Sequence, residues 1–140
     1  MNDKCAAGTG RFLEVLTERI LNIPLQELGS LSLKCQNPCL LSSVCTIFAE
    51  SEIISYLSEN RTNEDIVCGM HKAIAKRIIN MGTSGRIDYK EPVVFSGGVA
   101  KNIGVAKAIE EEIEKQVIIP TEPQITAALG AALFAKNSIG

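Results

Sequence analysis

Apolar residues recur at the spacing of an amphipathic helix in several stretches of the chain. This periodicity predicts helices over residues 11–21, 48–58, 63–80, 102–115 and 124–135. Thr62 or Asn63 can cap the helix at 63–80. In the helix at 48–58, the pattern places Ile54 and Leu57 on the buried side. Residues 22–41 contain prolines, a glycine and several serines, so beyond a short helix near 24–28 we expect irregular or extended chain.

Two short apolar runs have the length and the abrupt ends of buried strands. Residues 92–95 stop at Ser96-Gly97-Gly98, and residues 117–119 stop at Pro120. Residues 81–91 hold two glycines and no periodicity, which predicts a loop. Strand, helix, strand and helix joined by short links predict a single layered α/β domain.

Composition and charge narrow the classes of function. The chain has 140 residues, of which 46% are hydrophobic and 21% charged, as in an ordinary globular domain. Its formal net charge is −2 and its basic residues are scattered, so no basic stripe is available for nucleic acid or an anionic membrane. The longest apolar runs are far shorter than the roughly 20 residues of a membrane-spanning helix. No signal-peptide pattern opens the chain, and we therefore expect a cytoplasmic protein.

Two glycine-containing turns each lead directly into a predicted helix, at residues 3–10 and 96–102. Glycines let backbone N–H groups approach an anion closely, and a helix N-terminus adds partial positive charge, so a phosphate would fit there. A lone turn of this kind more often simply starts a helix, but two in one short domain favour a ligand site. Neither is a Walker A loop or a dinucleotide fingerprint, so a nucleotide site would be of another kind.

Five cysteines are present, and five cannot all pair within one chain. Cys5 and Cys45 each stand just before a predicted helix, where partial positive charge lowers a thiol pKa and favours an anionic cluster. Taken alone, two such residues are more often ordinary buried cysteines. An iron–sulfur cluster usually needs four thiolates, a number that a two-fold dimer of this chain would supply.

For the remaining cysteines and the single histidine, we favour structural positions over roles in a site. Cys35 and Cys39 form a C-x3-C segment that offers three thiols together with Cys45, although two incidental loop thiols are the favoured interpretation. Cys68 is surrounded by apolar neighbours and is assigned to core packing. His71 has no carboxylate at a suggestive spacing, so we expect a surface or interface position.

Four segments, in order and over nearly the whole chain, resemble the activators of 2-hydroxyacyl-CoA dehydratases. The segments are NDKCAAGTGRFLE, CTIFAESEIIS, VVFSGGVAKNIGV and PQITAALGAAL. These activators are BadF/BadG/BcrA/BcrD-type ATPases of the superfamily that unites acetate and sugar kinases, heat-shock chaperones and actin. The resemblance implies an α/β fold: one lobe of the actin-like ATPase fold, which is an incomplete ribonuclease-H-like domain.

The same resemblance implies cofactors, partners and site residues. The family's homodimers hold one four-iron, four-sulfur cluster between subunits, and the matching ligands here are Cys5 and Cys45. ATP or ADP with Mg would bind at two turns, whose residues are Asp3, Gly8, Thr9 and Gly10 on the phosphate side and Gly97, Gly98 and Asn102 on the adenosine side. In the family, ATP binding and hydrolysis change the angle between the cluster-bearing helices. The activator then passes one electron to a 2-hydroxyacyl-CoA dehydratase or a benzoyl-CoA-reductase-like partner.

The resemblance also implies what is missing and which alternatives stay open. Residues 1–140 match the C-terminal lobe, and no segment matches the N-terminal phosphate-binding lobe, so we expect a fragment that does not hydrolyse ATP alone. One alternative is a sugar or acyl kinase-like lobe with passive cysteines. Another is a thiol-rich zinc or partner-binding module that uses Cys35, Cys39 and Cys45. The acyl-CoA substrate of the partner cannot be deduced from this chain.

Overall fold

The computed structural model describes residues 9–42, 46–84 and 89–139. The helices and strands are α1 (Thr9–Leu16), α2 (Leu28–Ser32), α3 (Thr46–Ser58), α4 (Asn63–Ser84), β1 (Val93–Val94), α5 (Ile103–Ile113), β2 (Val117–Ile118) and α6 (Thr126–Ile139). A π-helical turn (Thr17–Leu21) and 3-10 turns (Leu25–Glu27 and Gly98–Lys101) lie between them. None of the helices in these ranges is long and apolar enough to cross a membrane.

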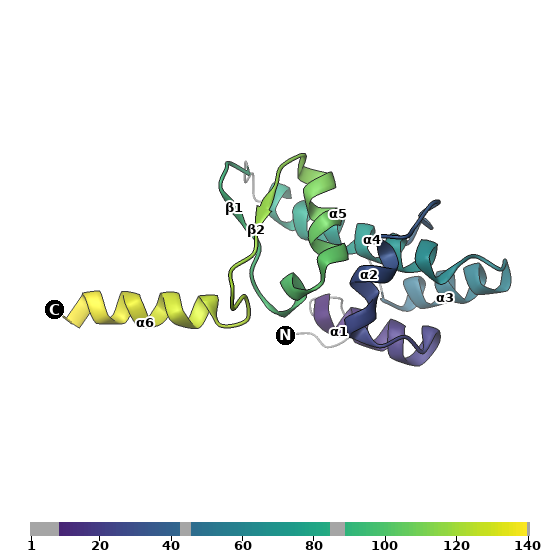
Figure 1. Cartoon of the computed structure of the whole chain (residues 1–140), viewed down its shortest axis with the longest axis horizontal. Helices are drawn as coiled ribbons and strands as arrows, with labels where there is room; N and C mark the ends of the chain where they lie inside the picture. The colour runs from purple at the N-terminus through teal and green to yellow at the C-terminus, as the bar shows by residue number, and fades with distance from the viewer. Residues whose placement is uncertain (1–8, 43–45, 85–88, 140) are drawn as a thin grey trace.

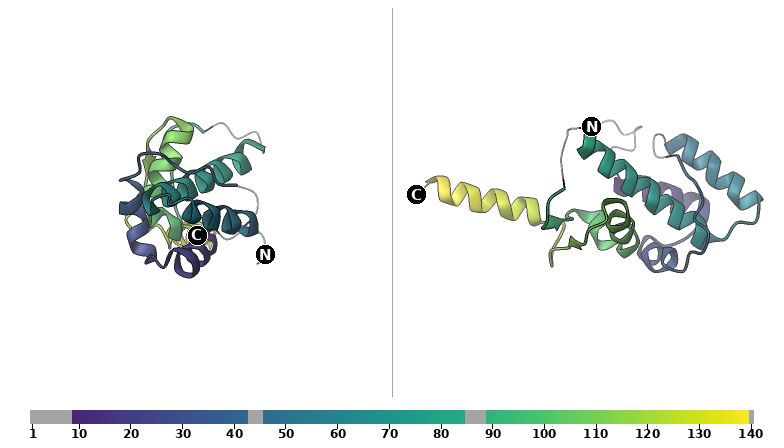
Figure 2. Two further views of the ribbon diagram at one scale, coloured as in Figure 1. Left: turned by 90° about the vertical axis from the view of Figure 1, so that its right-hand side faces the viewer. Right: turned by 90° about the horizontal axis from the view of Figure 1, so that it is seen from above.

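Helix α4 is the centre of the fold and packs against α2 and α5 (Figures 1 and 2). Its predicted apolar stripe forms the core, with Ile66, Val67 and Met70 fully buried. The capping prediction is confirmed at Thr62, whose Oγ1 accepts a hydrogen bond from the Asp65 backbone N–H at 3.2 Å. The helix ends at Ser84, beyond the predicted end at residue 80. The first part of the loop predicted at residues 81–91 is therefore helical.

The two predicted strands are present, one before and one after α5 in the sequence, and they pair with each other in parallel. Val93 pairs with Val117 and Val94 pairs with Ile118. The prediction that both strands are buried is wrong, because Val94 and Ile118 are each 54% exposed. In the described part of the chain the sheet has two strands, and no helix covers the face on which these two side chains lie.

The segment after α1 is more ordered than its composition indicates. The predicted helix over 11–21 is α1 followed by the π-helical turn, and it stops at Asn22, whose φ is 52°. Residues 28–32 then form α2 rather than irregular chain, with Leu28 fully buried. Gly29 does not break this helix. It permits α2 to approach the start of α5 closely, since a Cβ on Gly29 would lie 2.9 Å from Cγ1 of Ile103.

Helix α3 confirms one of the two inward positions that the periodicity indicated, since Leu57 packs against the core and Ile54 does not. Ala49 and Ile53 are fully buried and Leu57 is partly buried, whereas Ile54 is 54% exposed, so its predicted inward position is wrong. Ile54 lies one residue, or about 100° around the helix, beyond the buried Ile53.

Helix α6 confirms the last predicted helix and extends away from the rest of the fold (Figure 1 and Figure 2, right). Its large apolar side chains Leu129, Leu133 and Phe134 are more than half exposed.

Candidate functional site

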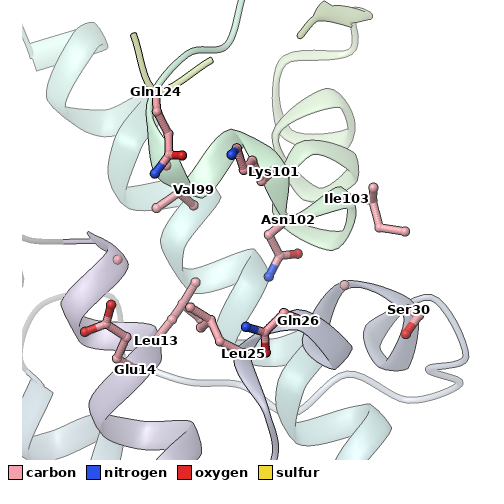
Figure 3. A pocket seen from close by; sticks show the side chains of 13 residues that line it. Leu13, Glu14, Leu25, Gln26, Ser30, Val99, Lys101, Asn102, Ile103 and Gln124 are labelled. Atoms are coloured by element: carbon pink, nitrogen blue, oxygen red, sulfur yellow. The ribbon is translucent and has the colours of Figure 1, made fainter. Parts of the chain in front are cut away.

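Gly10, at the end of the first glycine turn, and the second turn, almost ninety residues later in the sequence, meet at one cavity of about 650 Å³ (Figure 3). The start of α1 forms one wall, α2 and the turn before it form the second, and the turn leading into α5 forms the third. The lining residues are Gly10, Leu13, Glu14, Leu25, Gln26, Gly29, Ser30, Gly98, Val99, Lys101, Asn102, Ile103 and Gln124.

Three of the residues predicted from sequence, Gly10, Gly98 and Asn102, line this cavity together. Thr9 begins α1 and Gly97 precedes the 3-10 turn, so both flank the cavity without lining it. The other predicted site residues lie outside the described residues: Asp3, Cys5, Gly8 and Cys45.

Glycines allow the second turn to approach its neighbours. Gly97 has a φ of 101°, a conformation that favours glycine, and its N–H donates to the Pro123 carbonyl at 2.7 Å. A Cβ on Gly98 would lie 3.4 Å from Nε2 of Gln124, and a Cβ on Gly10 would lie 3.7 Å from Cγ2 of Val99. The turn is therefore held between the chain that follows β2 and the start of α1.

Asn102 caps α5 and lines the cavity at the same time. Its Oδ1 accepts hydrogen bonds from the backbone N–H of Gly104 at 2.9 Å and of Val105 at 3.2 Å. Two of the first donors of α5 are thus already satisfied. The start of α5 is consequently a poor place for an anion, whereas the start of α1 adjoins the cavity at Gly10.

Replacing Asn102 by alanine should remove this cap. We expect the free energy of unfolding to fall by about 1–2 kcal/mol, because the N–H groups of Gly104 and Val105 lose their acceptor. Urea denaturation measures the change. Asn102→Ser, which keeps a capping oxygen, should lose less, and equal losses in the two variants would contradict the capping argument.

The cavity wall is mixed in polarity, as a small polar ligand with an apolar part would require. Lys101 and the amides of Gln26 and Gln124 supply polar groups, as Figure 3 shows. Glu14 is already paired with Arg11 at 3.0 Å. Sequence reasoning missed Gln26 and Gln124, because isolated glutamines outside any motif give no signal.

Behind Asn102 lies His71, which is 1% exposed on α4, so the predicted surface or interface position is wrong. Its ring nitrogens contact Ser32 Oγ at 2.9 Å and Asn102 Nδ2 at 3.2 Å. Burial lowers the pKa of His71 to about 4, which makes the ring neutral at ordinary pH.

The cysteines of the C-x3-C segment have separate environments. Cys35 is half-buried, and burial first, then the neighbouring Cys68 thiol, raises its pKa to about 12. Cys39 is buried beside the guanidinium of Arg61. Cys68 is partly exposed, so its assignment to the core is wrong.

A carboxylate orders the loop that contains this segment. Asp65 Oδ1 accepts hydrogen bonds from the backbone N–H of Gln36 at 3.0 Å and of Asn37 at 2.9 Å. Within residues 9–42, 46–84 and 89–139, no three His, Cys, Asp or Glu side chains are grouped to hold a metal ion.

The sequence of this chain is similar to that of known proteins. Residues 1–135 match the model of the BadF/BadG/BcrA/BcrD ATPase family. The chain is 53% identical over 135 residues to the 2-hydroxyisocaproyl-CoA dehydratase activator of Clostridioides difficile, covering 96% of this chain and 50% of that protein. It is 34% identical to a benzoyl-CoA reductase component of Thauera aromatica, covering 96% of this chain and 49% of that protein. The chain thus spans about half the length of these curated relatives.

A solved structure gives the same result at the level of the fold. The activator of the 2-hydroxyisocaproyl-CoA dehydratase from Clostridium difficile with bound ADPNP superposes with a TM-score of 0.86 at 50% identity, covering 98% of this chain and 50% of that one. The expected fold class, one α/β lobe of the actin-like ATPase fold, is confirmed. The chain therefore belongs to the BadF/BadG/BcrA/BcrD ATPase family.

Proposed function

We propose that residues 1–140 are the C-terminal lobe of an ATP-dependent iron–sulfur activator, which transfers an electron to an acyl-CoA dehydratase or reductase. The main support is the identity of 53% over 96% of this chain to a protein named as a dehydratase activator. In this proposal a phosphate-binding N-terminal lobe completes the ATPase, and this lobe alone does not hydrolyse ATP.

The cavity supports the nucleotide part of the proposal. The related activator structure contains ADPNP, and here the cavity joins Gly10 of the first turn to Gly98 and Asn102 of the second, the two turns that the resemblance assigns to ATP or ADP with Mg. Asp3, Gly8, Thr9 and Gly10 would hold the phosphates, since the start of α1 adjoins the cavity. Gly97, Gly98 and Asn102 would contact the nucleoside, because the donors at the start of α5 are used by its cap.

The described surroundings of Cys45 fit an iron–sulfur cluster. Helix α3 begins at the next residue, and its first turn contains no acidic side chain that would repel an anionic cluster. Ile47 and Phe48 are 68% and 64% exposed, which gives a second copy of the chain an apolar surface to cover. Cys5 and Cys45 from two subunits would hold one four-iron, four-sulfur cluster, which supplies one-electron transfer.

The relatives support the choice of partner. Among them are a 2-hydroxyisocaproyl-CoA dehydratase activator and a benzoyl-CoA reductase component. We infer that a cytoplasmic homodimer of the complete protein delivers its electron to an enzyme of one of these two kinds.

Anaerobic reconstitution with iron and sulfide tests the proposal. We expect a brown dimer with broad absorption at the blue edge of the visible range and about two irons per chain, which is one four-iron cluster per dimer. Cys45→Ser should abolish both signals, because the dimer then lacks two of its four thiolates.

Cys68→Ser is the matched control, since this thiol is partly exposed on α4 and should not affect iron content. Zinc bound through Cys35, Cys39 and Cys45 with Cys5 dispensable would favour the metal-binding module instead. Iron binding that is unchanged in Cys45→Ser would refute the cluster assignment.

A further inference from the structure

His71 is the only histidine of the chain, and it lies at the point where α4 meets α2 and α5. Its side chain forms one hydrogen bond toward each of these neighbours. Nδ1 lies 2.9 Å from Ser32 Oγ at the end of α2, and Nε2 lies 3.2 Å from Asn102 Nδ2 at the cap of α5. The ring therefore connects two segments that are far apart in sequence.

The direction of each hydrogen bond follows from the cap. Asn102 Oδ1 already accepts from the N–H groups of Gly104 and Val105, so its NH2 group faces the ring and must donate to Nε2. Nε2 is then unprotonated, and the proton of a neutral ring resides on Nδ1, where it is donated to Ser32 Oγ. The Ser32 hydroxyl donates in turn to the Gly29 carbonyl at 3.0 Å. One neutral tautomer satisfies the whole chain of bonds.

Both ends of this chain of bonds belong to the cavity. Asn102 and Gly29 line it where its α2 wall meets its α5 wall, since a Cβ at Gly29 would lie 3.1 Å from Asn102 Oδ1. Gly104 provides the room for the central pair, since a Cβ there would lie 2.5 Å from His71 Nδ1 and closer still to Ser32 Oγ. The spacing of the two walls thus depends on atoms that do not themselves line the cavity.

His71 also contributes to the lining of a second cavity, which has a volume of about 410 Å³. The titratable groups that share this lining are Cys35 after α2, Cys68 and Lys72 on α4, and Lys107 and Glu111 on α5. Lys72 and Glu111 pair with each other at 3.3 Å. No carboxylate among the described residues hydrogen-bonds to the ring, so burial is what keeps the imidazole neutral.

We propose that His71 is a positioning residue for nucleotide binding: as its neutral Nδ1–H tautomer, it fixes the Asn102 amide and, through Ser32, the α2 wall at Gly29. The proposal rests on the assignment of the cavity to a nucleotide. A protonated ring would present Nε2–H to the NH2 group of Asn102, and two donors cannot bond. Asn102 would then have to turn its amide and give up the cap of α5, or move away from the ring.

Nuclear magnetic resonance of the imidazole tests the tautomer without any nucleotide. Because the chain has one histidine, a long-range ¹H–¹⁵N spectrum of the full chain needs no assignment. At neutral pH we expect a protonated Nδ1 and an unprotonated Nε2, with no titration near the ordinary histidine value of about 6.5. A protonated Nε2, or a ring that titrates near that value, would overturn the proposal.

Three variants test the positioning role. His71→Gln can still accept from Asn102 and donate to Ser32, whereas His71→Phe fills the space with neither group. Lys72→Ala is the control, as it removes the exposed neighbouring side chain. In the complete protein, binding of a fluorescent ADP analogue to His71→Phe should weaken by about tenfold or more, because a buried donor is left unpaired. His71→Gln should stay within about threefold of the wild type and Lys72→Ala should equal it.

Hydrogen exchange at the Gly104 and Val105 amides separates this inference from the proposed function. These amides should exchange faster in His71→Phe than in His71→Gln, whether or not nucleotide binds. If the complete protein, with its N-terminal lobe, binds no ADP analogue, the nucleotide assignment fails, while the tautomer and the exchange rates still decide the role of His71 in holding Asn102. Equal exchange in the two variants, or equal nucleotide affinity, would refute the positioning role.

Discussion

Replacing Gly104 by alanine should lower the free energy of unfolding by about 1–3 kcal/mol, the range typical of an overpacked core. A Cβ at this position would lie 2.5 Å from Nδ1 and 2.8 Å from Cε1 of His71, and closer still to Ser32 Oγ. Moving the ring aside, toward the second cavity that it helps to line, would break its hydrogen bond with Ser32 or with Asn102. Either the hydrogen bond between His71 and Ser32 breaks or α5 moves away from α4. Urea denaturation followed by circular dichroism measures the loss.

Gly130 provides the matched control for this substitution. It lies within α6, and a Cβ there would meet nothing within 4 Å. Gly130→Ala should leave stability unchanged or raise it by up to about 1 kcal/mol, because alanine favours the helix. If Gly104→Ala proves as stable as Gly130→Ala, the Ser32–His71 pair can move aside at no cost, and the close packing inferred at α5 is wrong.

The elements that sequence predicted well are those fixed by local signals. The cap at Thr62 is next to the α4 helix that it caps, and its apolar stripe lies within that same stretch of sequence. Asn102 likewise directly precedes α5, the helix that it caps. The glycine turn at Gly97 and Gly98, which precedes α5, was also recognisable. The meeting of Gly10, Gly98 and Asn102 at one cavity agrees with the grouping of the two turns that the resemblance implied.

What the sequence could not show depends on contacts between distant segments. His71 bonds with Ser32 and Asn102, which are 39 and 31 residues away, so helical periodicity around position 71 gave no indication of its burial. Gly29 lies in a segment rich in prolines and serines, a composition typical of a loop, so the sequence predicted irregular chain there. It is in fact the point where α2 touches the start of α5. The exposure of Val94 and Ile118 likewise depends on how many strands the sheet has and not on the strands' own residues.

The buried imidazole should also make the fold sensitive to mild acid. The pKa of His71 falls from 6.5 to about 4 on folding because of burial, so the unfolded chain takes up the proton first as the pH drops. The contribution of the neutral ring is complete above about pH 6.5 and is lost progressively as the pH falls toward 4. The total loss is about 3 kcal/mol, and about 2 kcal/mol of it has occurred by pH 5.

Comparison of the wild type with His71→Gln isolates this effect, because glutamine cannot titrate. Urea denaturation at pH 7.5 and at about pH 5 should show the wild type losing about 2 kcal/mol more than the variant. Asp65 does not interfere, since the hydrogen bond from the Asn37 backbone lowers its pKa below the ordinary value and its stabilising contribution is lost only in stronger acid. Equal losses in the two proteins would mean that the ring is accessible to protons in the folded state, which would also remove the reason for a single neutral tautomer behind Asn102.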